Sequence, residues 1–99
     1  MTTYAVLYTY GIDSGEARLE HRDAHVQFLL GLQEQGTLLL CGAYSDDQHP
    51  GALLVVSAES AEEARSTVEQ DPYNQHGLID DIGVREWVSR LGSRSEALA

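Results

Sequence analysis

The chain has 99 residues, of which 42% are hydrophobic and 22% are charged, as is usual for one small globular domain. Sixteen acidic residues against six basic ones give a formal net charge of -10, which repels nucleic-acid phosphates and anionic lipid surfaces. The composition therefore argues against nucleic acid and membranes as partners. An anionic ligand would have to be held by local arginines against the overall field.

The N-terminal segment and the cysteine content limit the compartment and the chemistry. Residues 1–11 contain neither a basic stretch nor a long apolar run, so we expect no secretory signal or membrane span and predict a cytoplasmic protein. A single cysteine, Cys41, excludes an intrachain disulfide and a multi-cysteine metal site. Its place in the apolar run LLLCGAY predicts a small buried side chain.

β-Branched and aromatic residues dominate residues 3–10, which are predicted to form the first strand. Because side chains alternate along a strand, one side of it carries four large residues: Tyr4, Val6, Tyr8 and Tyr10. We interpret this side as packing surface, where one tyrosine could also line a ligand site.

A helix is predicted from the turn at residues 11–15 to about Gln35, with Gly36 as its C-terminal stop. Asp13 and Glu16 are spaced as a capping box for its first turn. Three polar side chains share the apolar stripe of this helix: Arg18, Arg22 and His25. We infer a polar pocket at that end of the core.

The second half of the chain predicts a hairpin and a second helix. Residues 37–44 and 52–57 are expected to be strands, joined by the turn-forming segment SDDQHPG. Ser60 and Glu63 form a capping box for a helix over residues 60–70. The expected inner stripe of this helix is Ala61, Ala64, Arg65 and Val68, with Arg65 along the surface.

The helix should end at Asp71-Pro72, because the residue before a proline avoids the helical region. Residues 80–88 are the fourth predicted strand, with Trp87 on one side and three aliphatic residues on the other: Ile82, Val84 and Val88. Residues 89–99 show no sustained pattern and are predicted to be a flexible tail.

The order βαββαβ indicates an α+β fold of ferredoxin-like type, with a four-stranded antiparallel sheet and two helices on one face. The second predicted strand is apolar on both sides, with Leu38 and Leu40 opposing Leu39 and Cys41. Two helices cover only one face, and no third helix remains for the other. We therefore predict a homodimer packed sheet to sheet.

Three short elements resemble the YciI-related family: Arg22-Asp-Ala-His25, Gly42 and Asp71-Pro72-Tyr73. The resemblance covers roughly residues 3–88 of a single domain spanning 1–99. It implies a dimeric α+β barrel similar to muconolactone isomerase, with a histidine–aspartate pair in a cleft. Some members are associated with breakdown of chlorinated or hydroxylated aromatic compounds. The segment YSDDQHPG is shorter here than in many members.

The resemblance places the histidine–aspartate pair on His25 and Asp71 and implies a small enzyme that needs no cofactor. An unperturbed imidazole titrates at about pH 6.5, so His25 can act as general acid and base. Asp71 would fix its tautomer, and Arg22 would stabilise a developing negative oxygen. Tyr73 and Gly42 complete the expected substrate-binding residues. The expected reaction is an isomerisation or a lyase-like elimination on an anionic carbonyl or aromatic-derived small molecule.

The same residues also have purely structural interpretations. His25 can be a hydrogen-bonded core residue, Asp71 can simply cap the turn at Pro72, and Tyr73 can be a packing residue. A non-catalytic ligand-binding or regulatory module using the same cleft is therefore the alternative function, and a cofactor-free monooxygenase is a third. Arg18 and Arg22 can lie along the surface and pair with acidic neighbours: Glu16, Asp23 or Glu69.

A metal site is the remaining alternative. His21 and His25 are four residues apart on a helix, a spacing that lets two imidazoles bind one zinc ion. The glutamate of the zinc-protease motif is missing beside His21, and His49 and His76 lie in predicted loops. We therefore expect no metal. No glycine-rich phosphate loop follows any strand, so we expect no nucleotide site either.

Overall fold

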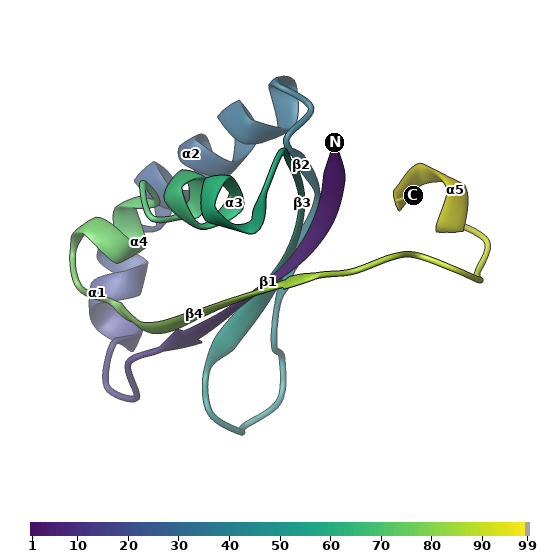
Figure 1. Cartoon of the computed structure of the whole chain (residues 1–99). Helices are drawn as coiled ribbons and strands as arrows, with labels where there is room; N and C mark the ends of the chain where they lie inside the picture. The colour runs from purple at the N-terminus through teal and green to yellow at the C-terminus, as the bar shows by residue number, and fades with distance from the viewer. Residues whose placement is uncertain (99) are drawn as a thin grey trace.

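The computed structural model describes residues 1–98 and shows a four-stranded antiparallel sheet with helices packed on one face (Figure 1). The strands lie in the order β2-β3-β1-β4. The elements in chain order are β1 (Thr2–Tyr10), α1 (Gly15–Glu20), α2 (Arg22–Glu34), β2 (Leu38–Ala43), β3 (Gly51–Ala58), α3 (Ala61–Val68), α4 (Pro72–Gln75), β4 (Ile79–Glu86) and α5 (Ser95–Leu98). The predicted ferredoxin-like α+β class is confirmed, and every strand begins and ends within two residues of its expected bounds.

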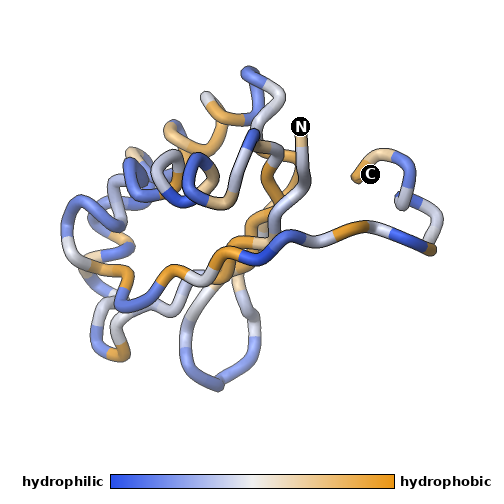
Figure 2. The backbone as a smooth tube through the Cα atoms, viewed as in Figure 1, coloured by the Kyte–Doolittle hydropathy of each residue, from blue (hydrophilic) through white to orange (hydrophobic). Residues whose placement is uncertain are grey.

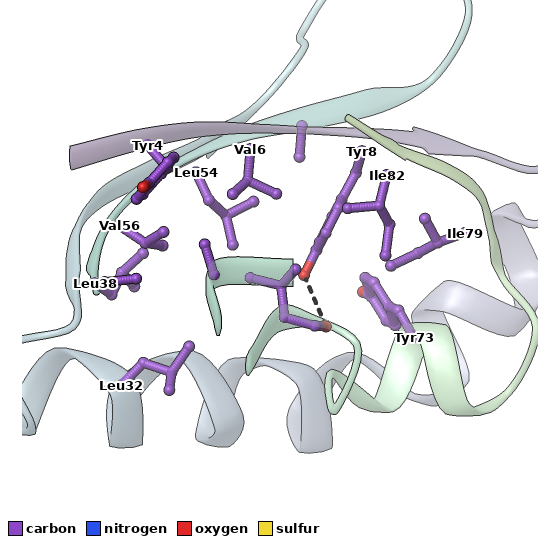
Figure 3. Packing of buried hydrophobic residues seen from close by; sticks show 14 of the residues in the cluster. Tyr4, Val6, Tyr8, Leu32, Leu38, Leu54, Val56, Tyr73, Ile79 and Ile82 are labelled. Atoms are coloured by element: carbon purple, nitrogen blue, oxygen red, sulfur yellow. Dashed lines mark hydrogen bonds between the residues drawn. The ribbon is translucent and has the colours of Figure 1, made fainter. Parts of the chain in front are cut away.

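Strand β1 is central and pairs antiparallel with β3 on one side and β4 on the other. Strands β2 and β3 form the predicted hairpin. The four large residues on the inner side of β1 are all buried, and Figure 3 shows three of them directed from the sheet toward the helices: Tyr4, Val6 and Tyr8. Burying each such side chain stabilises the fold by roughly 1.5–3 kcal/mol.

Helices α2 and α3 cover the inner face of the sheet. Leu32 of α2 joins the core (Figure 3), and Ala64 and Val68 of α3 are completely buried. Arg65 is exposed, as expected for a side chain along the surface, but Ala61 of the predicted inner stripe is exposed as well. The helix is therefore buried along a narrower face than the sequence indicated.

A register shift in β2 changes which of its side chains face the helices. The strand accommodates one extra residue after Leu38, so that Leu40 pairs with Val55 and Cys41 pairs with Leu54. Cys41 consequently lies on the inner face and Leu40 on the outer face. The prediction that Leu38 and Leu40 share one side was wrong, because simple alternation does not anticipate a β-bulge.

The predicted first helix is divided into α1 and α2 at His21, whose φ of -101° and ψ of 9° depart from helical values. The ring of His21 stacks on that of His76, after α4, with 3.7 Å between ring centres. The predicted capping box of Asp13 and Glu16 was wrong. Ser14 occupies the N-cap position, and its side chain makes no capping hydrogen bond.

The other helix ends follow the signals in the sequence more closely. Gly36, after α2, has a φ of 78°, a left-handed conformation that favours glycine. Ser60 caps α3 by accepting a hydrogen bond of 3.1 Å from the Glu63 backbone N–H. Asp71 ends this segment as predicted but also caps α4, a short helix that the sequence did not indicate.

The outer face of the sheet carries none of the helices α1–α4 (Figure 1), and Figure 2 shows hydrophobic colour along the strands. This face is apolar over β2, β3 and the middle of β1, whereas β4 contributes the charged residues Asp81 and Arg85 to it. On this face Leu7 and Leu40 are 38% and 44% exposed, whereas Val55 is 3% exposed although it lies outside the main core cluster. Beyond β4 the chain reaches α5, where the Leu98 carbonyl accepts a hydrogen bond of 3.2 Å from the Thr3 hydroxyl. No helix within residues 1–98 is long and apolar enough to cross a membrane.

Candidate active site

The side chains of His25 and Asp71 meet beneath the sheet, although 46 positions separate them in the sequence. His25 comes from the first turn of α2, and Asp71 caps α4. The imidazole Nδ1 lies 2.8 Å from Oδ1 and 2.9 Å from Oδ2 of Asp71. Because a carboxylate accepts hydrogen bonds, Nδ1 carries the proton and donates it. The neutral ring therefore holds its lone pair on Nε2.

Asp71 is completely buried, yet its carboxylate is well supplied with donors. Beside His25, the Tyr8 hydroxyl donates to Oδ2 at 2.9 Å, and the Tyr73 backbone N–H donates to Oδ1 at 2.9 Å. A buried charge without such partners would cost several kcal/mol. The surrounding elements β1, α2 and α4 thus hold this carboxylate in one position.

The ring of Tyr73 stacks on the ring of His25, with 3.8 Å between their centres and 5° between their planes. Tyr73 in turn packs edge to face against Tyr10, at 5.7 Å. Figure 3 shows Tyr73 beside Tyr8, below the end of β1. Stacking and hydrogen bonding together restrict the His25 ring to one plane and one tautomer.

A pocket of about 100 Å³ opens beside the imidazole, between α2 and the β2–β3 edge of the sheet. Its wall is mostly apolar and includes Tyr10, His25, Leu29, Cys41, Gly42 and Ala52. Among residues 1–98, no hydrogen bond involves Nε2 of His25. Nε2 is therefore the ring nitrogen that is left to bind a ligand in the part of the chain that the structure describes. An apolar void of about 150 Å³ can bind benzene, so this smaller pocket has room for at most a single small ring.

The tyrosines around the pair are held in the neutral form. Burial raises the pKa of Tyr8, and the neighbouring negative charge of Asp71 raises it further. Burial likewise raises the pKa of Tyr10 and of Tyr73, while the positive charge of Arg18 lowers both. The hydroxyl of Tyr8 therefore serves Asp71 as a permanent donor.

The two arginines of the predicted polar pocket lie differently. Arg22 is exposed on α2 and lines no part of the pocket, although its charge lowers the pKa of Tyr73 and so acts close to that side chain. Arg18 donates from Nε to the Ser14 hydroxyl at 2.9 Å and lies over the Tyr10 ring, 4.5 Å from its centre. Its expected ion pairs with Glu16, Asp23 or Glu69 do not form. Within residues 1–98 the only salt-bridge contact joins His25 and Asp71.

The prediction of a buried Cys41 was wrong. The bulge in β2 directs this side chain to the pocket, where it is exposed. Its remaining burial raises the pKa of the thiol, which keeps the reactive thiolate scarce at neutral pH. Gly42 also contributes to the pocket wall, and a methyl group at its Cβ position would meet no atom within 4 Å.

The four histidines do not assemble a metal site in the part of the chain that the structure describes, where no group of three potential ligands occurs. His21 stacks on His76, and His25 is held by Asp71. His49 lies in the hairpin loop, with Nε2 2.9 Å from the Tyr10 carbonyl oxygen. The pair at the helical spacing of His21 and His25 is thus split between two different environments.

The model of the YCII-related domain matches residues 2–88, which is most of the chain. The chain belongs to the YCII-related family. Protein YciI of Escherichia coli O6:H1 and Protein YciI of Shigella flexneri are each 33% identical to it over 81 residues, covering 74% of this chain and 83% of theirs.

Solved structures agree with this assignment of the YCII-related domain. The 5-chloro-2-hydroxyhydroquinone dehydrochlorinase TftG from Burkholderia phenoliruptrix, in complex with 2,5-dihydroxybenzoquinone, superposes with a TM-score of 0.75 at 25% identity, over 94% of this chain and 98% of that chain. An uncharacterized NIPSNAP domain protein from Burkholderia xenovorans gives a TM-score of 0.53 at 12% identity, over 91% of this chain and 95% of that chain. The second match shows the shared fold alone.

Proposed function

We propose that this YCII-related chain is a small enzyme that removes a proton and a leaving group from an anionic carbonyl or hydroxylated aromatic compound, without a cofactor. The observation that carries the proposal is the contact of 2.8 Å between His25 and Asp71, with the imidazole in the wall of a pocket. A neutral imidazole that is fixed by a carboxylate on one nitrogen is a general base on the other.

In the proposed step, Nε2 of His25 takes a proton from an acidic O–H or C–H group of the substrate. The freed electron pair moves through the conjugated system and expels the leaving group with its own bonding pair. The substrate thereby loses one proton and one anion and gains one π bond. Asp71 stabilises the imidazolium that forms, and the imidazolium then releases its proton to water. In an isomerisation the same proton would return to another atom of the substrate.

The similarity to TftG supports this reaction class. TftG is a dehydrochlorinase, an enzyme that removes hydrogen chloride, of 5-chloro-2-hydroxyhydroquinone, and its structure contains 2,5-dihydroxybenzoquinone. Loss of hydrogen chloride is the loss of one proton and one anion described above. In our proposal Tyr73 holds the His25 ring by stacking, Gly42 leaves the pocket wall open, and Arg22 attracts the anion toward the site.

Chloride release from 5-chloro-2-hydroxyhydroquinone, measured without oxygen, tests the proposal. His25→Gln should lower kcat by about 100-fold or more, because general acid–base catalysis contributes at least that much. His76→Gln, outside the pocket, is the control and should retain the wild-type rate. A loss of less than a few-fold in a folded His25→Gln variant contradicts the proposal. Saturable binding by the wild type without turnover would overturn it in favour of the ligand-binding module.

We also infer that a second copy of the chain covers the outer face of the sheet. The exposed Leu7 and Leu40 lie there beside the poorly accessible Val55, which forms an apolar surface on the side without helices α1–α4. An antiparallel sheet that faces water usually alternates apolar and polar residues, whereas β2 and β3 carry apolar side chains on both faces. The partner that best matches an apolar sheet face is an identical sheet face.

A further inference from the structure

The guanidinium of Arg18 is held in place by two contacts beside the pocket. Its Nε donates to the Ser14 hydroxyl at 2.9 Å, and its central carbon lies 4.5 Å from the centre of the Tyr10 ring. Ser14 is itself 8% exposed and donates to the Gly11 carbonyl at 2.6 Å. The side chain of Arg18 is therefore already ordered, and it loses less conformational entropy on binding a ligand than a free surface arginine does.

Tyr10 connects this arginine to the pocket. One part of its ring lies under the guanidinium, and the side chain is also part of the pocket wall. The charge of Arg18 acts on the hydroxyls of both Tyr10 and Tyr73, so the guanidinium lies within electrostatic range of the stacked His25–Tyr73 rings. Arg18 does not itself line the pocket, but its positive charge lies against the ring of Tyr10, which does.

The terminal nitrogens of Arg18 remain available to a ligand. Only Nε of this side chain donates a hydrogen bond within residues 1–98, and no acidic side chain there forms a salt bridge with it. A guanidinium presents two more NH₂ groups in a planar fork that fits carboxylate and phenolate oxygens. None of the arginines within residues 1–98 forms a salt bridge with a carboxylate, so Arg18 is distinguished by the Ser14 and Tyr10 contacts that fix it and not by a missing partner.

We propose that Arg18 is a substrate-binding residue that receives the anionic oxygen of a small ring compound whose reacting proton faces His25. This inference deepens the proposed function and rests on it for the position of the reacting atoms. Arg22 is the less suitable residue, because it is exposed and has no contact that orients its side chain within the described structure. The substrate class is accordingly a monocyclic enolate, phenolate or carboxylate rather than a neutral ring.

Two probes of one ring size separate charge recognition from packing. 2,5-Dihydroxybenzoquinone has two acidic hydroxyls that are ionised at neutral pH, whereas hydroquinone is neutral there. Dissociation constants for both are measured by calorimetry with the wild type, Arg18→Gln, Arg18→Lys and Arg22→Gln. Arg18→Gln should weaken the anion by roughly 10-fold or more, the loss expected for one charge-assisted hydrogen bond, and leave hydroquinone within about two-fold.

Arg18→Lys keeps the charge and loses the fork, so its anion affinity should fall between those of the wild type and Arg18→Gln. Arg22→Gln removes a charge that attracts the anion but does not receive its oxygen in this proposal, so it should weaken anion binding by less than Arg18→Gln does. Anion binding by the wild type should also weaken as sodium chloride is raised, while hydroquinone binding does not. This last measurement needs no variant, so it applies even if Arg18→Gln fails to fold.

Equal losses for both probes in Arg18→Gln, or an anion affinity insensitive to salt and to Arg18, overturn the inference. So does an absence of measurable binding of the anion to the wild type. These failures are distinct from failure of the proposed function. If His25→Gln abolishes turnover while the Arg18 variants bind the anion normally, the proposed function is supported and the role of Arg18 is contradicted. If Arg18→Gln weakens anion binding but the wild type shows no turnover, the role of Arg18 is supported and the proposed reaction is contradicted.

Discussion

Oδ1 of Asp71 accepts hydrogen bonds both from Nδ1 of His25, at 2.8 Å, and from the backbone N–H of Tyr73, at 2.9 Å. The carboxylate that starts α4 is therefore also the group that orients the imidazole. Its other oxygen accepts from Tyr8 in β1. The sequence left helix capping and contact with His25 as alternatives for Asp71, and in the structure one carboxylate makes both interactions.

Asp71→Asn should separate the charge of this carboxylate from its shape. The amide oxygen can still accept from the Tyr73 N–H and from Nδ1 of His25, so the fold should be retained. The negative charge that stabilises an imidazolium is lost, and we expect kcat to fall by roughly 10- to 100-fold with little change in KM. Steady-state kinetics with the chlorinated hydroxyhydroquinone measure both constants.

Asp71→Ala is the contrasting variant, because it leaves Tyr8, Tyr73 and His25 without their shared acceptor inside the core. Breaking a buried charged network of this kind costs about 3–5 kcal/mol. Urea unfolding should therefore show a large loss of stability for Asp71→Ala and a small one for Asp71→Asn. Equal kcat for Asp71→Asn and the wild type would exclude a role of the charge in catalysis.

The sequence predicted the fold well and the site in part, for physical reasons that individual residues illustrate. Alternation in β1 identified the buried side of Tyr4 and Tyr8, because burial on one face forces a period of two. The side chains of His25 and Asp71 come together only through tertiary packing, and the family resemblance supplied their pairing. The function of Tyr8 as a donor to Asp71 was missed, since a tyrosine in an apolar strand pattern does not reveal its hydrogen-bond partner.

Bulges and helix breaks were the features that local patterns did not predict. The extra residue in β2 reversed the sides of Leu40 and Cys41, and so placed a thiol in the pocket wall. The break at His21 is accompanied by its stacking on His76, a contact across 55 positions that no local signal encodes. Arg18 was expected to pair on the surface, whereas its contacts are with Ser14 and Tyr10.

The buried tyrosines should make the fold sensitive to alkali. Burial raises the pKa of Tyr8 and of Tyr10 in the folded chain, whereas tyrosines in the unfolded chain lose their protons near pH 10. Above that pH the unfolded state binds fewer protons than the folded state, so the free energy of unfolding falls as pH rises. The expected slope is about 1.4 kcal/mol per pH unit for each tyrosine. The stabilisation is complete below pH 10.

Urea unfolding between pH 8 and 11 measures this dependence. Tyr8→Phe removes one of the tyrosines with a raised pKa and should lower the slope above pH 10 by about 1.4 kcal/mol per pH unit, whatever it does to stability at neutral pH. Tyr44→Phe is the matched control, because Tyr44 is 47% exposed. Identical slopes for the wild type and Tyr8→Phe would mean that the Tyr8 hydroxyl ionises as easily in the folded chain as in the unfolded one.

Cys41 offers a chemical probe of the pocket. The thiol is exposed in the pocket wall, and partial burial raises its pKa, so iodoacetamide should alkylate it slowly at pH 7 and faster as the pH rises. Saturating 2,5-dihydroxybenzoquinone should slow the alkylation by occupying the same space. Mass spectrometry of intact protein follows the reaction, with Cys41→Ser as the unreactive control. Alkylation at an unchanged rate under saturating ligand would place the binding site elsewhere.

Leu7→Glu tests the proposed sheet-to-sheet dimer. Leu7 lies in the central strand on the outer face and is 38% exposed in the single chain, so a glutamate can be solvated there in a monomer. In a dimer the same carboxylate would be buried between two apolar sheets, at a cost of several kcal/mol. Sedimentation equilibrium should therefore give about twice the chain mass of 10.9 kDa for the wild type and 10.9 kDa for Leu7→Glu.

Leu19→Glu, on α1 at a position 73% exposed, is the control and should sediment as the wild type does. A wild-type protein that sediments as a monomer, or a Leu7→Glu variant that remains a dimer, would show that this face is not where two copies meet.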